Sequence, residues 1–199
     1  SPAKPDTYES MASITIDQAP QYRIRAARAD EVEAMQRIDI ASSELFRDTG
    51  LIDFGAGDGP LEAIPETRLR QGLGEMLVWV AADEADAAVG FALCADRGDD
   101  LYLDQISVMP DHGRRGLGAR LTRRVIQEAE TRSYKRVSLS TFRKVPWNGP
   151  FYKKLGFKEI PHWRLNDWQL AIELAQRETM DVKLRCFMQR PVSRHRRFV

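Results

Sequence analysis

The sequence predicts a single α/β (α+β) domain built from both strands and helices. Segments with the alternating pattern of strands and the spacing of amphipathic helices succeed one another from about residue 21 to 191. The 199 residues, 43% of them hydrophobic, fit one domain, since domains commonly hold about 100–200 residues. We therefore expect a flexible N-terminal tail over 1–20, one domain over 21–191 and a basic C-terminal tail over 192–199.

The first elements are predicted from alternation and capping signals. Residues 21–26 alternate like a strand. Asp30 followed by Glu33 has the form of a capping box, at the start of a helix that reaches about Arg47. Residues 51–60 are rich in Gly and Asp, which is typical of a loop.

A second helix is expected over 61–72, and two strands over 76–82 and 88–95 form an antiparallel hairpin around a polar turn. Residues 101–109 form the next strand. The helix after it has an apolar stripe spaced by four, at Leu117, Leu121, Val125 and Ala129. The remaining elements are expected to be strands over 136–141, 157–160 and 183–189 and helices over 149–154 and 166–177.

A glycine-rich turn, Gly113-Arg-Arg-Gly-Leu-Gly118, joins the 101–109 strand to this helix. Such a turn offers several backbone N–H groups and the positive end of the helix dipole to one anion. Ala119 and Arg120 follow Gly118, where a phosphate loop of the NTPase kind has Lys and Ser or Thr. The third glycine of a dinucleotide loop is also missing. Alone, the turn is equally typical of an ordinary helix cap.

Composition excludes several classes of protein. No stretch approaches the roughly 18 consecutive apolar residues of a membrane span, so no membrane partner is expected. Cys94 and Cys186 lie in strand-like apolar contexts and are predicted to be buried free thiols of a cytoplasmic protein. The three histidines lack ligand spacing, so no metal is expected.

A second motif decides the interpretation of the glycine-rich turn. Asn148 precedes Phe151-Tyr-Lys-Lys-Leu-Gly-Phe157. In this order and spacing, the two motifs resemble those of the GNAT superfamily, the acetyl-CoA-dependent N-acetyltransferases. The resemblance covers about residues 21 to 191 and implies a mixed, mostly antiparallel central sheet flanked by helices.

The resemblance implies acetyl-CoA as co-substrate and assigns residues to bind it. The pantetheine is expected along the backbone of Ile106 and Val108 and beside Asn148. The pyrophosphate is expected at the turn, with cofactor contacts at Gly113, Arg114, Arg115, Gly116, Gly118 and Ala119. Family members usually carry Gln or Arg where Gly113 stands, and a glycine would keep the backbone N–H.

The resemblance also assigns catalytic roles. Tyr152 is the candidate acid that protonates the departing thiolate of CoA, because a phenol of pKa about 10 is protonated at neutral pH. The alternative is a core Tyr that packs against Phe151 and Leu155. A backbone N–H near Val108 would meet the oxyanion. Asn148 can equally be a turn residue before Gly149.

The general base and the acceptor site are less defined by the sequence. Asp104 is the candidate base, on one face with Ile106 and Val108 if strand alternation is regular. The alternative is a surface or salt-bridged Asp. Glu44 and Asp48, at helical i,i+4 spacing, are the alternative candidates for the base. Together with Trp147 they are also the candidates for acceptor binding.

The charge is divided unevenly along the chain. Residues 1–112 carry 9 Lys/Arg against 22 Asp/Glu, whereas 113–199 carry 21 against 7. A basic cofactor half and an acidic acceptor half would suit a cationic amine, of a small molecule or a peptide. The alternative is that these charges merely solvate the surface.

Three functions are considered. The first is an N-acetyltransferase that acts on a primary amine by direct attack in a ternary complex. The second is a catalytically silent acyl-CoA-binding sensor. The third, nucleic-acid binding through the basic segment 194–197, is disfavoured by the net charge of +1. Exposed strand edges leave room for a homodimer.

Overall fold

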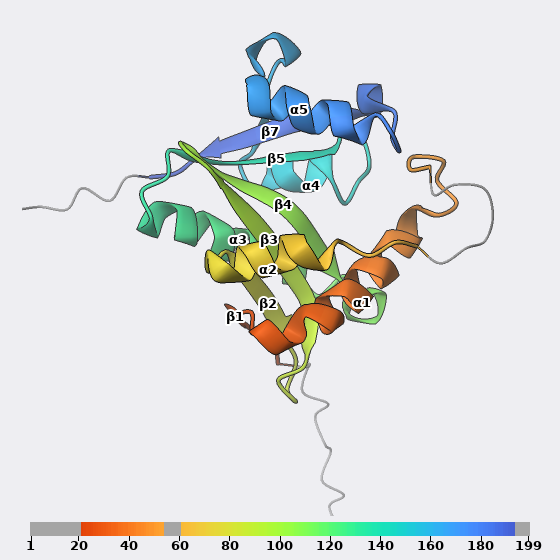
Figure 1. Cartoon of the computed structure of the whole chain (residues 1–199), viewed down its shortest axis with the longest axis vertical. Helices are drawn as coiled ribbons and strands as arrows, with labels where there is room; N and C mark the ends of the chain where they lie inside the picture. The colour runs from red at the N-terminus through yellow and green to blue at the C-terminus, as the bar shows by residue number, and fades with distance from the viewer. Residues whose placement is uncertain (1–20, 54–60, 194–199) are drawn as a thin grey trace, which may run out of the picture.

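The computed structural model describes residues 21–53 and 61–193 (Figure 1). A seven-stranded sheet has the order β1-β2-β3-β4-β5-β7-β6. The strands are β1 (Arg23–Ala26), β2 (Val78–Ala82), β3 (Ala88–Arg97), β4 (Asp100–Val108), β5 (Arg136–Phe142), β6 (Lys158–Glu159) and β7 (Arg185–Pro191). The α-helices are α1 (Val32–Ser43), α2 (Glu66–Gly74), α3 (Leu117–Thr131), α4 (Gly149–Lys154) and α5 (Asp167–Gln176).

The predicted fold class is confirmed. Every strand pair is antiparallel except β4 with β5, which is parallel, so the sheet is mixed and mostly antiparallel. Helices cover both faces, with α1 and α2 on one side of β2–β4 and α3 on the other (Figure 1).

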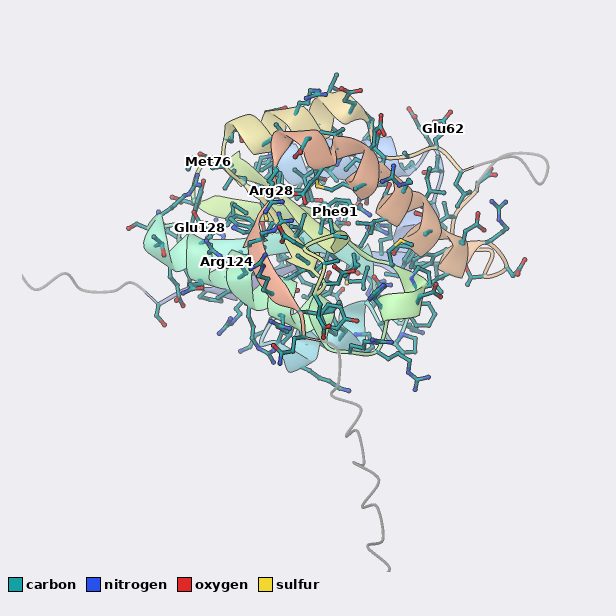
Figure 2. The ribbon with its side chains drawn as sticks, turned by 90° about the horizontal axis from the view of Figure 1, so that it is seen from below. Arg28, Glu62, Met76, Phe91, Arg124 and Glu128 are labelled. Atoms are coloured by element: carbon teal, nitrogen blue, oxygen red, sulfur yellow. The ribbon has the colours of Figure 1, made fainter. Side chains whose placement is uncertain are left out.

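Two cores follow from this layering. On one face, the predicted stripe of α3 packs against the sheet and is fully buried. On the other face, Met35 of α1 and Leu69 of α2 pack with Phe91 of β3, which Figure 2 labels in the interior. On that same side, Trp168 of α5 covers Tyr102 of β4.

Strands β4 and β5 pair over only four residues, from Asp100↔Arg136 to Leu103↔Leu139. β4 then continues to Val108 without β5 beside it. The divergence begins where β4 has a β-bulge: Leu93 of β3 pairs with Gln105 and Cys94 pairs with Leu103, so Asp104 is the extra residue. A bulge bends its strand and increases the twist, which opens the sheet at this point.

Two predicted helix starts are wrong. The second helix begins at Glu66, not 61, because a proline disfavours helical backbone in the residue before it and Pro65 therefore ends the extended stretch. The Asp30–Glu33 capping box does not form. Instead, the Glu31 carboxylate accepts from the N–H of Arg28 at 2.7 Å, and the chain enters α1 through a 3-10 turn.

Cys94 and Cys186 are buried free thiols, as predicted. Within the described residues, no helix is both long enough and apolar enough to cross a bilayer. Both predicted tails and most of the predicted 51–60 loop lie outside the residues that the structure describes, apart from residues 192–193 of the second tail.

Candidate active site

A cavity of about 640 Å³ lies where β4 and β5 diverge. It brings together four residues that the sequence singled out from distant segments: Asp104, Ile106, Asn148 and Tyr152. Three other elements complete the lining of the cavity. α1 contributes Asp39, Ser42 and Ser43, α5 contributes Ile172, Ala175 and Gln176, and β7 contributes Arg185.

The free edge of β4 carries unused backbone groups. Val108 stands opposite Gly90, and the N–H of Met109 donates to Val89 at 2.8 Å. That pattern makes Val108–Gly90 a non-hydrogen-bonded pair, and the same holds two residues earlier for Ile106. The N–H and C=O of both residues therefore point away from β3, toward the open side where an extended amide ligand could pair.

The glycine-rich turn places several backbone N–H donors just before α3. Gly116 has φ +76°, a left-handed value that favours glycine, and a Cβ placed there would meet nothing within 4 Å. Among the described residues, nothing accepts from the N–H groups of Arg115, Gly116 and Gly118. Together with the start of the 15-residue helix, these donors suit a phosphate group.

Asn148 has one amide atom satisfied and one open. Its Oδ1 accepts from Thr141 Oγ1 at 2.8 Å, whereas its Nδ2 is buried without an acceptor in the described part of the chain. An unpaired buried donor costs about 1–3 kcal/mol. Because Asn148 lines the cavity, the carbonyl of a bound amide could satisfy this donor, which fits the pantetheine contact expected here.

Tyr152 combines core packing with access to the cavity. Its side chain is 5% exposed, and its ring lies edge-on to Phe151 and Phe157 at 5.0 and 5.6 Å between centroids. Burial raises the pKa of the phenol well above its usual value, and the Arg185 guanidinium opposes this shift. The phenol is therefore protonated at neutral pH and able to donate.

Comparison with known proteins identifies the family of the chain. The model of the Acetyltransferase (GNAT) family matches residues 44–157. The chain belongs to the GNAT acetyltransferase family. The match spans the divergence of β4 and β5, the glycine-rich turn and the Asn148–Phe157 motif.

Solved structures of other acetyltransferases share the fold. The ribosomal-protein-S18-alanine N-acetyltransferase from Escherichia coli has a TM-score of 0.61 at 19% identity, covering 90% of this chain and 99% of that one. The PaiA N-acetyltransferase from Thermoplasma acidophilum, in complex with coenzyme A, has 0.60 at 14%, covering 86% and 99%. N-acetylglutamate synthase from Neisseria gonorrhoeae, with coenzyme A and N-acetyl-glutamate, has 0.61 at 14%, covering 87% and 36%.

In this GNAT chain, two residues of the turn that were expected to contact the cofactor have partners within the chain. The N–H of Gly113 donates to the carbonyl of Pro110 at 2.9 Å, so the 3-10 turn uses the donor that was assigned to the cofactor. The guanidinium of Arg115 turns back onto Tyr22, whose hydroxyl accepts from it at 2.8 Å. Arg114 is exposed with φ +59°, and Ala119 lies in the first turn of α3.

The prediction that Asp104 shares one face of β4 with Ile106 and Val108 is wrong. The bulge breaks the alternation, and the Asp104 carboxylate forms an ion pair with Arg68 of α2. The side chains of Ile106 and Val108 pack on the opposite face, against the α3 side of the core. Asp104 still lines the cavity, but with a guanidinium on its carboxylate.

Glu44 and Asp48, the acids expected to bind the acceptor, are not among the residues that line this cavity. The chain leaves α1 through a 3-10 turn, so Glu44 and Asp48 do not share a helical face, and Glu44 pairs with Arg47 at 2.6 Å. Phe46 of the same segment lines the cavity instead. The ring of Trp147 lies 6.0 Å from that of Phe46 and is 51% exposed, which places Trp147 at the edge of the site.

The sequence interpretation missed Asp39, a buried carboxylate on α1. It accepts from Gln105 Nε2 at 2.8 Å, from the N–H of Ile64 at 2.9 Å and from Ser107 Oγ at 3.1 Å. Burial raises its pKa, and these three hydrogen bonds oppose the shift. The available signal was an acid between Ile38 and Ile40 in a helix whose neighbours are core residues.

Arg185 was also missed. It stands at the start of β7, and its guanidinium lies 4.6 Å over the ring of Phe142 while lining the cavity. Burial lowers the pKa of this guanidinium. The available signal was a charged residue within a segment predicted to be a strand.

Proposed function

We propose that the chain is an acetyl-CoA-dependent N-acetyltransferase that acts on a primary amine by direct attack in a ternary complex. One observation carries the proposal: the unpaired edge of β4, the open donor of Asn148 and the phenol of Tyr152 meet in one cavity. Two of the acetyltransferases that share the fold bind coenzyme A.

The residues fit the parts of acetyl-CoA. The turn before α3 would hold the pyrophosphate through the N–H groups of Arg115, Gly116 and Gly118. The edge at Ile106 and Val108 would pair with the pantetheine like an added strand. The co-substrate would supply an activated acetyl thioester at the cavity.

The reaction would form a C–N bond and break a C–S bond. The amine nitrogen attacks the thioester carbonyl, and the N–H of Val108 stabilises the developing oxyanion. Tyr152 gives its proton to the departing sulfur. Asp104 is the first candidate to take the proton of the amine, and Asp39 is the second, because both carboxylates line the cavity.

The test is a CoA-release assay with acetyl-CoA and a broad panel of amines, beside a calorimetric titration with acetyl-CoA alone. Turnover with an amine supports the transferase and names the class of acceptor, a small molecule or a peptide. Acetyl-CoA binding without turnover favours the catalytically silent sensor. Absence of acetyl-CoA binding overturns both.

A further inference from the structure

Arg185 is a partly buried cation whose hydrogen bonds within the described residues all go to neutral groups. Its guanidinium donates to Gln176 Oε1 at 3.1 Å, Ser140 Oγ at 3.2 Å and Met180 Sδ at 3.4 Å. Among the described residues, no carboxylate forms an ion pair with it, and the groups that raise its pKa against the effect of burial are Tyr102, Cys186 and Tyr152.

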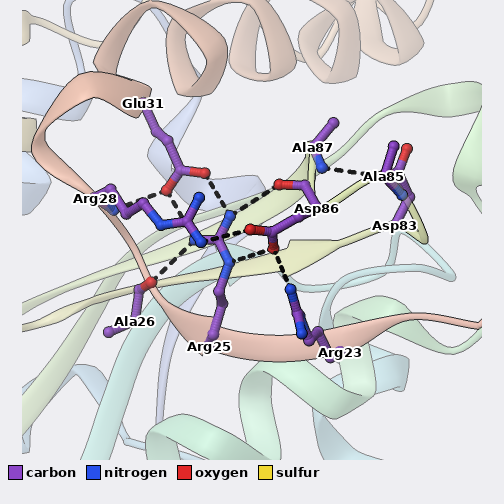
Figure 3. Close-up of polar contacts among 9 residues, drawn as sticks. All are labelled: Arg23, Arg25, Ala26, Arg28, Glu31, Asp83, Ala85, Asp86 and Ala87. Atoms are coloured by element: carbon purple, nitrogen blue, oxygen red, sulfur yellow. Dashed lines mark hydrogen bonds and ion pairs between the residues drawn. The ribbon is translucent and has the colours of Figure 1, made fainter.

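A second arginine shows how unusual this is. Arg25 is also largely shielded from solvent, but its guanidinium pairs with Glu31 at 2.6 Å and with Asp86 at 2.9 Å (Figure 3). A buried charge without a counter-charge is costly, so folded proteins pair such groups or use them. Arg185 therefore bears the cost of desolvating its charge, but no ion pair within the described residues offsets that cost.

The acids that line a second cavity with Arg185 are already engaged. This cavity, of about 490 Å³, contains Glu159, Glu173 and Asp181. Glu159 pairs with Arg143 at 3.0 Å, Glu173 pairs with Arg177 at 2.9 Å, and Asp181 accepts from the N–H of Lys183 at 3.0 Å.

On the side of the main cavity, both acids are likewise occupied. Asp104 pairs with Arg68, and Asp39 holds its three hydrogen bonds. Arg97, over the ring of Trp168, adds a third guanidinium to this lining. The cavity therefore has three arginines against two acids, which argues against the cationic acceptor expected from the charge split.

We propose that Arg185 binds a carboxylate of the acceptor, so that the acceptor is an amine that also carries a carboxylate, such as an amino acid. This inference rests on the proposed function. A guanidinium has five N–H donors in a planar fork that matches a carboxylate. The three neutral contacts leave two of these donors, in the same cavity as Tyr152.

The experiment measures binding to the CoA-loaded protein by calorimetry. The probes are N-acetyl-L-alanine and N-acetyl-L-alaninamide, which differ only in the carboxylate. Wild type is expected to bind the carboxylate probe at least about tenfold more tightly, since a hydrogen bond to a charged group contributes about 1.5–3 kcal/mol. In R185Q the two affinities should become equal.

Two further variants keep the result interpretable. R185K retains the charge without the fork and should keep part of the preference. R177Q removes an exposed arginine that directly follows α5 and lies outside the main cavity, and it should keep all of the preference. Acetyl-CoA titration and circular dichroism establish that each variant is folded.

Equal binding of the two probes by wild type, including no binding of either, overturns the inference. So does an R185Q protein that keeps the preference. Failure of the proposed function is separate: CoA release from amines without a carboxylate, undiminished in R185Q, leaves the transferase standing and contradicts the carboxylate site. Binding of the carboxylate probe with no CoA release from any amine supports the carboxylate site and contradicts the transferase.

Discussion

At the scale of single residues, Tyr152 gives a direct test of the chemistry. Y152F removes only the phenol oxygen and keeps the ring that packs on Phe151 and Phe157. Since general acid catalysis contributes about 10²–10⁴-fold, kcat for CoA release should fall about 100-fold or more. Acetyl-CoA affinity and melting temperature should stay near those of wild type.

The matched control is Y102F. Tyr102 is also a buried phenol that lines the cavity, but its ring packs on Trp168 under α5. Loss of the Tyr102 hydroxyl in Y102F should leave kcat within a few-fold of the wild-type value. Equal kcat values for Y152F and wild type would return Tyr152 to a purely structural role.

Asp39 gives a prediction in pH. Burial raises its pKa in the folded protein above the unfolded value, so the folded state binds the proton more tightly. The resulting stability is fully present below the unfolded pKa of about 4 and is lost as the pH rises through the raised folded value.

The comparison is with D39N, which cannot titrate at this position. The difference in unfolding free energy between wild type and D39N should favour wild type more at about pH 4 than at about pH 7. Urea denaturation at both pH values measures it. A difference that grows with rising pH would mean that the three hydrogen bonds outweigh burial and that Asp39 has a lowered pKa.

At the scale of elements, the glycine-rich turn offers a matched pair of glycines. Gly116 and Gly98 have φ of +76° and +72°, and a Cβ at either would meet nothing within 4 Å. Alanine should therefore cost each position about 1–2 kcal/mol through backbone strain alone. Only G116A should also weaken acetyl-CoA binding, because the strained residue would lie among the N–H donors of the turn.

Urea denaturation and calorimetric titration separate the two effects. Similar losses of stability with a loss of acetyl-CoA affinity confined to G116A support the phosphate site. If both variants bind acetyl-CoA as wild type does, the turn before α3 is an ordinary helix cap.

Local patterns explain why the elements could be predicted from the sequence. The stripe at Leu117, Leu121 and Val125 has one consistent period, so helix α3 and its buried face were correct. The face of Asp104 could not be predicted, because a bulge inserts one residue without changing the apolar pattern around it. The entry to α1 depends on the hydrogen bond from the N–H of Arg28 to the Glu31 carboxylate. The sequence places Glu31 and Glu33 in similar surroundings, so it does not show which of the two acids caps the helix.

At the scale of the whole molecule, the site is harder to predict because it is assembled from distant segments. The Asn148–Phe157 motif is local and was found by its spacing. Asp39 becomes notable only when Gln105 and Ser107 of β4 are packed against α1. Arg185 becomes notable only when β7 pairs with β5 and its guanidinium forms no ion pair with an acid of the described residues. Neither fact is local in sequence.

An ionic cluster ties the first strand to the rest of the molecule. Asp86, in the turn between β2 and β3, pairs with Arg23, Arg25 and Arg28 at 2.8, 2.9 and 2.5 Å (Figure 3). These arginines come from β1 and the entry to α1, so one carboxylate joins three elements. The hydrogen bonds from Arg23, Arg25 and Arg28 hold the pKa of Asp86 well below its usual value.

The last prediction concerns D86N, which keeps the side-chain shape and suits the φ of +62° found here. A lowered folded pKa stabilises the protein above the unfolded pKa of about 4, and this stability is lost as the pH falls below it. The wild-type advantage in melting temperature should therefore be constant from about pH 5 to pH 8 and shrink below about pH 4. It should also shrink in 1 M salt, where the Debye length is about 3 Å.

D83N is the control in the same turn. Asp83 accepts from the N–H groups of Ala85 and Ala87 at 3.0 and 2.9 Å and is not part of the ionic cluster (Figure 3). Its replacement should also lower the melting temperature, because an amide oxygen accepts these two hydrogen bonds more weakly than a carboxylate does, but by an amount that salt leaves nearly unchanged. If D86N and D83N respond alike to salt, the cluster acts through hydrogen bonding in the turn, and charge does not join β1 to the hairpin.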